Sequence, residues 1–282
     1  MKEFTFQLCE EADEPTGKID HIAEIKEDGR RVMVVKENDN IYLWGRDPIN
    51  KEHFPEIVEA FKRIPGNFIV DCEFAVFTNQ LKTDRGLLQS RDRTNDKFKM
   101  RLLKEKYPAT AVILDMLEFN GQNLRNEEYQ KRKQQIREAF NGIPFDIEGF
   151  KEPIKISKGM VPKEAWELAQ KHQLEGIVEK DIHSKYTGKR SPDWVKIKRR
   201  ETFILKFTGY DISPVGITLT NHEGFRVAVN GEKHKKVKDR LDKQGYVIAQ
   251  VRGMAGKTEK GRIREIVYDS IIEGNGGDTN GG

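Results

Sequence analysis

The sequence predicts an α+β protein with two domains, and three observations support this fold class. The chain has 282 residues, enough for two ordinary domains that each bury a core. Strand and helix patterns are mixed over the first 200 residues, whereas short strands dominate afterwards. The last ten residues contain five glycines and no apolar residue. We therefore expect one domain over residues 1–200, a small β-barrel over 201–272 and a disordered tail over 273–282.

Strands in the first domain are predicted where short runs are rich in β-branched or aromatic residues. These runs are residues 20–26, 31–37, 67–77 and 110–117. Helices are predicted where apolar residues recur at helical spacing, at residues 51–64, 126–140 and 162–172. Gly66 supplies a stop signal for the first helix, and Pro162 occupies a first-turn position in the last.

Short strands are predicted after residue 200 because turn signals divide the sequence at close intervals. The expected strands are residues 203–210, 217–220, 225–229, 245–251 and 262–268. One charged helix is expected at residues 233–243. Five short strands and one helix are the ingredients of a small barrel such as an oligonucleotide-binding (OB) fold.

Charge is distributed unevenly along the chain. Charged residues make up 34% of the sequence, yet the net charge is only +4. Between Lys180 and Arg264 there are 21 lysines and arginines and nine acidic residues, a net charge of +12. This regional excess favours a surface that binds a polyanion, although a solvated lysine-rich surface would give the same count.

Cysteine content and the N-terminus indicate the compartment. Cys9 and Cys72 are too few for a disulfide framework or a structural zinc site, which suits a reducing compartment. No secretory signal pattern opens the chain, and no run of 18 apolar residues occurs. We therefore expect a cytoplasmic protein that has no membrane partner.

A candidate nucleophile lies between the first two predicted strands. Gly29 permits a tight turn after Asp28, which leaves Lys26 at a strand end. A lysine amine becomes nucleophilic when desolvation or a neighbouring cation lowers its pKa. A solvated hairpin would carry the same Lys-x-Asp-Gly pattern, so this motif alone leaves both interpretations open.

Two acids occur inside the apolar run 67–77. Because Asp71 and Glu73 lie two residues apart, their side chains share one face of the predicted strand. Such a pair is costly unless it meets a cation, a ribose hydroxyl or a metal ion. An exposed edge strand is the alternative interpretation.

A third group of polar residues follows the predicted helix at residues 162–172. Glu175 precedes a Gly-Ile-Val strand, and Lys196 and Lys198 alternate along another strand, so both lysines face the same way. Two lysines opposite acids describe a cleft for a polyphosphate with a divalent cation. Trp194 is expected to pack behind this cleft, pointing away from the two lysines.

In this order and at these separations, the motifs resemble those of the covalent nucleotidyltransferase superfamily, and most closely the ATP-dependent DNA ligases. Residues 24–31 match the family's Glu-x-Lys-x-Asp-Gly-x-Arg motif. The other resemblances are Gly45-Arg46-Asp47 with a Ser-Arg-Asn-type motif, Asp71-Cys72-Glu73 with Asp-Gly-Glu, Leu114-Asp115 with Phe-Asp, Glu175-Gly176-Ile177-Val178 with the Glu-Gly motif, and residues 194–198 with the lysine-pair motif. The resemblance implies a nucleotidyltransferase domain of the ATP-grasp-like ligase catalytic type, followed by an OB-fold domain.

The resemblance also implies a reaction and its site. Lys26 would attack the α-phosphate of ATP, the AMP would pass to a 5′-phosphate at a nick, and the 3′-hydroxyl would then displace it. Mg²⁺, or Mn²⁺ in its place, is the expected metal cofactor, held by Glu73 and Glu175. The expected ATP-binding residues are Glu24, Lys26, Arg31, Arg46, Glu73, Leu114, Lys196 and Lys198.

Nicked duplex DNA is the expected partner of a monomeric enzyme, and replication, repair and recombination are all compatible settings. Lysines and arginines around the lysine-pair strand and in the small domain are expected to contact duplex phosphates. They are Lys185, Lys189, Arg190, Arg199, Arg200, Lys235 and Lys236.

Two alternative functions stay open. RNA ligases and messenger-RNA capping enzymes share the lysine motif and the acids, although the Tyr-x-Gly-Lys-Arg-Ser pattern at residues 186–191 favours DNA ligases. An inactive nucleic-acid-binding module is the second alternative, because the family's C-terminal Arg-x-Asp-Lys sequence has no match here.

Overall fold

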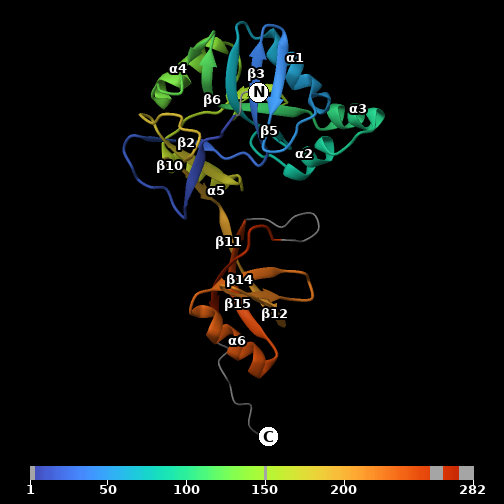
Figure 1. Cartoon of the computed structure of the whole chain (residues 1–282), viewed down its shortest axis with the longest axis vertical. Helices are drawn as coiled ribbons and strands as arrows, with labels where there is room; N and C mark the ends of the chain where they lie inside the picture. The colour runs from blue at the N-terminus through green and yellow to red at the C-terminus, as the bar shows by residue number, and fades with distance from the viewer. Residues whose placement is uncertain (1–3, 149–150, 255–262, 273–282) are drawn as a thin grey trace. The chain divides into compact units, whose positions relative to one another are not determined.

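The computed structural model describes residues 4–148, 151–254 and 263–272 (Figure 1). The chain divides into two compact units, Met1–Lys198 and Arg199–Gly282. The expected tail, residues 273–282, and the first residue of the expected strand 262–268 lie outside the described residues.

A six-stranded sheet forms the larger part of the first unit. Its main strand order is β4-β3-β5-β6-β7, and β8 pairs in parallel with β6. The strands are β3 (Arg30–Glu37), β4 (Asn40–Trp44), β5 (Phe68–Val76), β6 (Ala109–Phe119), β7 (Gln122–Asn123) and β8 (Ile154–Ile156). Central strand β5 is buried along almost its whole length because side chains cover both faces.

A second sheet of four strands completes this unit. Its order is β1-β10-β9-β2, and the terminal strand β1 runs parallel to β10. The strands are β1 (Leu8–Ala12), β2 (His21–Ile25), β9 (Gly176–Asp181) and β10 (Arg190–Lys198).

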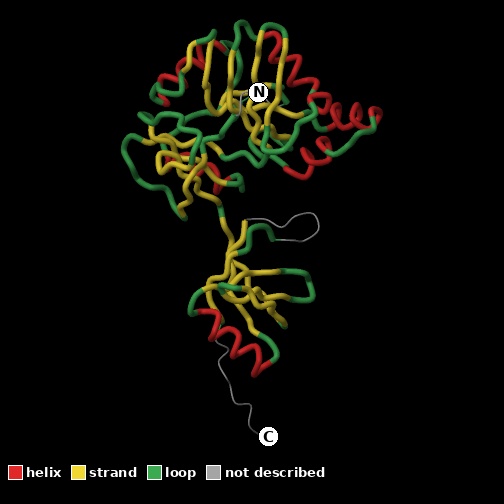
Figure 2. The backbone as a smooth tube through the Cα atoms, in the orientation of Figure 1, coloured by secondary structure: helices red, strands yellow, loops and turns green. Residues whose placement is uncertain are grey.

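Helices pack on one face of each sheet, and the opposite faces of the two sheets share a buried cluster. Figure 2 shows these helices and strands in the first unit. Helix α1 (Pro55–Arg63) and the end of α4 (Tyr129–Ala139) pack on the six-stranded sheet. Helix α5 (Pro162–Lys171) packs on the four-stranded sheet. Between the sheets, Met33 and Ile69 of one share a buried cluster with Trp194 of the other.

Several element predictions need correction in the first unit. The expected helix 51–64 is broken at Phe54 into a short 3₁₀ helix, Lys51–His53, and α1, where Pro55 begins the new helix. Helices α2 (Arg85–Asp92) and α3 (Lys97–Lys106) have no counterpart among the predicted elements. Asp84 and Asp96 cap their N-termini by accepting backbone N–H groups.

The second unit contains two three-stranded sheets and one helix. Their orders are β11-β15-β16 and β12-β13-β14. The elements are β11 (Arg200–Phe207), β12 (Gly209–Ser213), β13 (Gly216–Thr220), β14 (Arg226–Asn230), α6 (Lys233–Gln244), β15 (Val247–Met254) and β16 (Val267–Ile271). The expected strand 203–210 is split, because the chain leaves one sheet after Phe207 and enters the other at Gly209.

One hydrophobic cluster holds the second unit together. It combines Leu219 and Val229 from the hairpin strands with Val237 of α6 and Val251 of β15. Among the described residues, no helix has the length and apolar content needed to cross a membrane.

Candidate active site

Two cross-strand rows on the inner face of the four-stranded sheet bring the candidate residues together. Glu24 of β2 pairs with Val178 of β9, which pairs with Lys196 of β10. The next row runs from Lys26 through Gly176 to Lys198. The backbone N–H of Lys26 donates to the Gly176 carbonyl at 2.9 Å, and Gly176 pairs with Lys198. Strand alternation therefore places Glu24, Lys26 and the lysine pair on one face.

Gly176 keeps the row between Lys26 and Lys198 open. Its φ angle is 152°, and a Cβ atom there would lie 2.1 Å from the carbonyl oxygen of Ile197. A side chain at this position would collide with the backbone of β10, so glycine is required. The residue between the two lysines therefore carries no side chain into the site.

Lys26 forms an ion pair with the acid that precedes this glycine. Its Nζ lies 2.6 Å from Oε1 of Glu175, and both side chains are largely buried. Burial alone would lower the pKa of the Lys26 ammonium, but Glu175, with Glu73 and Asp28, raises it above its ordinary value. The resting lysine is therefore protonated and held in place.

The two candidate metal ligands bind protons more strongly than free carboxyl groups do. Burial raises the pKa of Glu73 to about 8, and the attraction of Lys26 and Arg31 offsets only part of this effect. Burial also raises the pKa of Glu175, against the opposing effect of Lys26. Among the described residues, buried Glu175 Oε2 has no hydrogen-bond partner. This oxygen is therefore an available acceptor for a cation.

The turn after Lys26 is fixed by close packing against β5. A Cβ atom on Gly29 would lie 2.1 Å from the carbonyl oxygen of Phe74. The N–H of Asp28 donates to the Thr83 hydroxyl at 3.0 Å, and that hydroxyl also bonds the buried carboxyl of Glu27. One threonine side chain thus contacts both residues that follow the lysine.

Arg31 and Asp71 form a bidentate pair on the facing sheet. The Arg31 Nε and Nη2 atoms donate to the Asp71 carboxylate at 2.9 and 2.6 Å. Tyr186 donates its hydroxyl to the same carboxylate at 2.8 Å, and the Arg31 guanidinium lies 5.6 Å from the Trp194 ring centroid. Asp71 therefore meets the cation that a buried acid requires.

Glu24 is enclosed by three donors that are not among the predicted site residues. Lys133 and Lys180 each donate to its carboxylate at 2.6 Å, and the Tyr129 hydroxyl also bonds it. Although burial opposes ionisation, the two lysines lower the pKa of Glu24 to about 2. Lys180 ends the Glu-Gly-Ile-Val-Glu-Lys sequence, so its strand alternation with Val178 was the available signal.

Trp194 corrects one prediction about the cleft. Its ring lies 4.1 Å from Lys180 Nζ and belongs to the cluster between the sheets. Val195 and Ile197 instead pack toward α5. Because alternate residues of β10 share a face, Trp194 lies on the same side as Lys196 and Lys198, and the expectation that it points away from them was wrong.

The remaining ATP-site candidates differ in exposure. Lys196 Nζ lies 3.0 Å from Glu11 of β1, and both are partly exposed. Leu114 packs against the small cluster of Ala75, Phe77 and Val112. Arg46 follows β4 in an exposed loop.

The candidate DNA-binding residues lie in both units. Lys185, Lys189 and Arg190 are exposed in the first unit, around the start of β10. In the second unit, Arg199 pairs with Glu201 at 2.9 Å and Arg200 donates to the Glu265 carbonyl at 3.1 Å. The candidates on α6, Lys235 and Lys236, are both exposed.

Comparisons with curated proteins identify related sequences. The bifunctional non-homologous end joining protein LigD of Bacillus subtilis (strain 168) is 28% identical over 204 residues, covering 67% of this chain and 33% of that protein. A probable DNA ligase of Dictyoglomus turgidum is 30% identical over 186 residues, covering 62% of this chain and 30% of that protein. The chain therefore spans about a third of the length of these relatives.

Comparisons with solved structures and family models agree with this relationship. The ligase domain of M. tuberculosis LigD has a TM-score of 0.60 at 17% identity, covering 95% of both chains. A Lig E DNA ligase, described as binding DNA with a minimal scaffold, has a TM-score of 0.67 at 14% identity, covering 96% of this chain and 100% of that one. At these identities the likeness shows a shared fold. Residues 5–198 match the family model of the ATP dependent DNA ligase domain, well over half of the chain, and the protein therefore belongs to the ATP-dependent DNA ligase family.

Proposed function

We propose that this protein seals 5′-phosphate/3′-hydroxyl nicks in duplex DNA, using ATP and a covalent lysyl-AMP intermediate on Lys26. One observation carries the proposal. Lys26 forms an ion pair with Glu175 and belongs to the cross-strand row that continues through Gly176 to Lys198. It lies on the face of its sheet that is turned toward Glu73. A nucleophile, two acids and a pair of cations are the groups that nucleotidyl transfer to an amine requires.

The first step forms one bond and breaks another. The Nζ of Lys26, after losing a proton, attacks the α-phosphate of ATP; an N–P bond forms and the bond to pyrophosphate breaks. Lys196 and Lys198 supply positive charge for the α-phosphate oxygens. Because Glu175 holds the resting lysine protonated, substrate binding must weaken this ion pair before attack.

The residues present fit a divalent cation. Among the described residues, Glu175 has a buried carboxylate oxygen without a hydrogen-bond partner, and burial raises the pKa of Glu73 to about 8 although Lys26 and Arg31 oppose this effect. Glu73 and Glu175 would hold Mg²⁺, which when bound neutralises charge on the triphosphate. Carboxylates that hold a metal ion attract the Lys26 ammonium less strongly. This change would lower the pKa of the ammonium toward the range in which the amine can react.

The later steps use the same site on DNA. The AMP passes from Lys26 to the 5′-phosphate, forming a P–O–P linkage as the N–P bond breaks. The 3′-hydroxyl then attacks that phosphate, the phosphodiester forms and AMP leaves. We propose that the enzyme acts as a monomer in the cytoplasm. The residues proposed to contact duplex phosphates are Lys185, Lys189, Arg190, Arg199, Arg200, Lys235 and Lys236.

We propose an OB fold for the second unit. Its first strand is divided between two sheets as β11 and β12, and α6 lies between β14 and β15 in the chain. The strand pairs β12–β13, β13–β14, β11–β15 and β15–β16 support a five-stranded Greek-key barrel.

The test separates this proposal from its alternatives. Incubation with α-labelled ATP or GTP, followed by denaturing electrophoresis, should give a labelled adduct with ATP only. The Lys26→Ala variant should lose the adduct and nick sealing completely while retaining the thermal unfolding temperature and affinity for DNA. A stable adenylate on Lys26→Ala would refute the assigned nucleophile.

Substrate choice needs a second assay. A GTP adduct would indicate a capping enzyme, and faster sealing of RNA than of DNA strands would indicate an RNA ligase. Absence of any adduct, with DNA binding retained, would leave an inactive nucleic-acid-binding module.

A further inference from the structure

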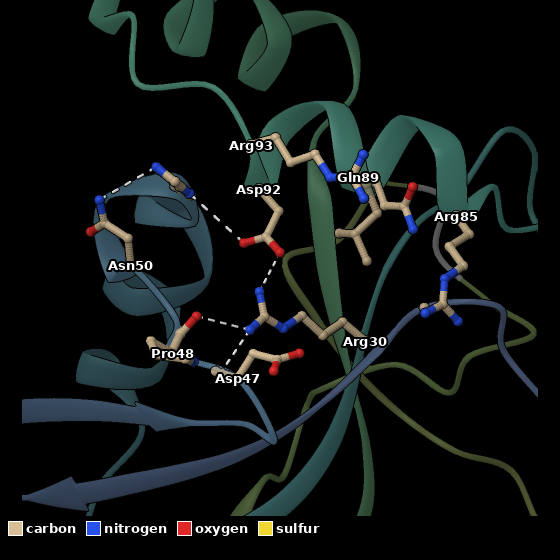
Figure 3. Close-up of a pocket in the computed structure, with 11 residues that line it drawn as sticks. Arg30, Asp47, Pro48, Asn50, Arg85, Gln89, Asp92 and Arg93 are labelled. Atoms are coloured by element: carbon tan, nitrogen blue, oxygen red, sulfur yellow. Dashed lines mark hydrogen bonds and ion pairs between the residues drawn. The ribbon is translucent and has the colours of Figure 1, made fainter.

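A cavity of about 510 Å³ lies beside the turn that follows Lys26. Gly29 and Arg30 form one wall, the segment from Asp47 to Asn50 forms another, and α2 supplies the third (Figure 3). The cavity is therefore bordered by the nucleophile turn and by a helix that no sequence motif predicted.

The arginines around this cavity fall into two kinds. Arg30 is engaged, because it bonds Asp92 and donates to the carbonyl oxygens of Asp47 and Pro48, both at 2.9 Å. Arg85 and Arg93 are instead exposed to solvent. The side chain of Arg85 is 54% exposed, and its guanidinium is 3.9 Å from the carboxylate of Asp28. Exposed cations therefore begin next to the reacting centre.

The next helix, α3, extends this cationic surface. None of its ten residues is buried, and five of them are lysine or arginine. Lys97, Arg101 and Lys104 recur at i, i+4 and i+7, so they form one stripe along the helix. Over residues 85–106 there are eight cations and three acids. A ten-residue helix that buries nothing contributes little to the core, so its charges need another explanation.

We infer that the surface formed by Arg85, Arg93, Lys97, Arg101 and Lys104, here the α2–α3 surface, binds the phosphate backbone of duplex DNA beside the nick. This inference rests on the proposed function. From Lys97 to Lys104 the helix rises about 10 Å, roughly the span of three phosphates along one strand. The α2–α3 surface lies outside the basic interval 180–264, so it is a separate contact.

Duplex DNA fits this surface better than a protein partner does. Exposed Phe98 and Leu102 lie beside the stripe on α3 and are the side chains that an acidic protein would bury. However, the cations continue from α3 through α2 to the Asp28–Gly29 turn, where the reacting phosphate must lie. Only a substrate that enters the site would use this continuity.

The test is the triple variant Lys97→Ala/Arg101→Ala/Lys104→Ala in the full chain. Fluorescence anisotropy measures its affinity for a nicked duplex with a 3′-dideoxy end, which cannot be sealed. We expect binding about tenfold weaker at roughly 0.1 M salt, and a log–log salt slope smaller by about 2 to 3. The rate of adduct formation with labelled ATP should be unchanged, because no group of the ATP site is altered.

The matched control removes three exposed cations from helices α4 and α5, as Lys131→Ala/Lys163→Ala/Lys171→Ala. It should weaken DNA binding less than about threefold. If both triple variants lost the same affinity for DNA, the effect would be one of net charge and the inference would be overturned. Unchanged affinity in the α3 variant would also overturn it. A second variant, Phe98→Ser/Leu102→Ser, should bind DNA normally; loss of affinity there alone would also overturn it. Failure of the wild-type protein to form an adduct would instead refute the proposed function.

Discussion

The Glu73 carboxyl links protonation to stability and, under the proposed function, to metal binding. Its carboxyl is buried beside Arg31 and Lys26, yet its pKa is about 8 rather than near 4.5. Between these values the unfolded chain releases this proton while the folded chain retains it. Because the native state then binds more protons, this group makes the free energy of unfolding fall as pH rises from about 4.5 to 8.

The Glu73→Gln variant tests this ionisation. Glutamine stays neutral, so the variant should unfold at a higher temperature than the wild type at pH 8.5, by about 4 °C, with little difference at pH 5. Calorimetry at the two pH values measures the effect. The exposed Glu59→Gln variant is the control, and its unfolding temperature should show no such pH-dependent difference from the wild type.

Metal dependence gives the same residue a second readout. The wild-type protein should need less Mg²⁺ for half-maximal adduct formation at pH 8.5 than at pH 7, because an ionised Glu73 binds a cation more readily. Glu73→Gln should lose this pH dependence and form the adduct at least about a hundredfold more slowly. A variant with wild-type metal dependence would show that Glu73 is not a ligand.

At the scale of elements, the loop between β5 and α2 positions the turn that follows Lys26. Thr83 forms an isolated bridge with Phe77, accepts the N–H of Asp28 and donates to the carboxyl of Glu27. Two adjacent residues of the turn are thereby fixed by one side chain from another element. Under the proposed function, we expect Thr83 to act as a positioning residue for Lys26, with no direct contact to the reacting atoms required.

Thr83→Val keeps the shape of the side chain and removes its hydroxyl. We expect the adduct to form about tenfold more slowly at saturating ATP, with KM changed less than about twofold, because a misplaced nucleophile loses orientation. Thr83→Ser restores the hydroxyl and should recover the rate. If both variants slowed equally, the effect would be one of packing, and the positioning role would be refuted.

The sequence predicts which candidate site residues share a strand face better than it predicts the side chains that support them. Alternation along strands places Lys196 with Lys198 and Asp71 with Glu73, and the structure has both pairs on shared faces. The donors to Glu24 come from elsewhere: Lys133 and Tyr129 lie on α4, where a periodic pattern cannot distinguish a buried lysine from a solvated one.

Missed elements have physical reasons as well. Helices α2 and α3 are so rich in charge that their apolar periodicity is weak, and their Asp caps are the clearer signal. Strand β1 has five residues, two of them acidic, and depends on pairing with a strand from the far end of the unit. Local sequence carries no information about that pairing.

At the scale of the whole molecule, each hydrophobic cluster draws its residues from one unit. Leu219 belongs to the cluster of the second unit and is fully buried, whereas the clusters around the site lie within residues 1–198. Separate cores allow separate cooperative transitions, so heating should unfold the units in two steps.

Leu219→Ala should distinguish these steps in calorimetry. The lost side chain costs about 2–5 kcal/mol, which should lower only one transition, by more than about 10 °C. ATP without a divalent cation should raise only the other transition, by mass action on the unit that holds Lys26. One transition that responds to both changes would show that the units unfold together.

The parallel pairing of β1 with β10 also fixes when the site can exist during synthesis. Leu8 pairs with Arg190, and Lys198 completes the cross-strand row of Lys26. Residues near the N-terminus therefore reach their native pairing only after residues 190–198 have been synthesised. While the ribosome makes the intervening chain, β1 has no strand to pair with, and Lys26 has no lysine pair in its sheet. Under the proposed function, catalytic competence therefore arrives with the last strand of the unit, and an incomplete nascent chain would not form the Lys26 adenylate.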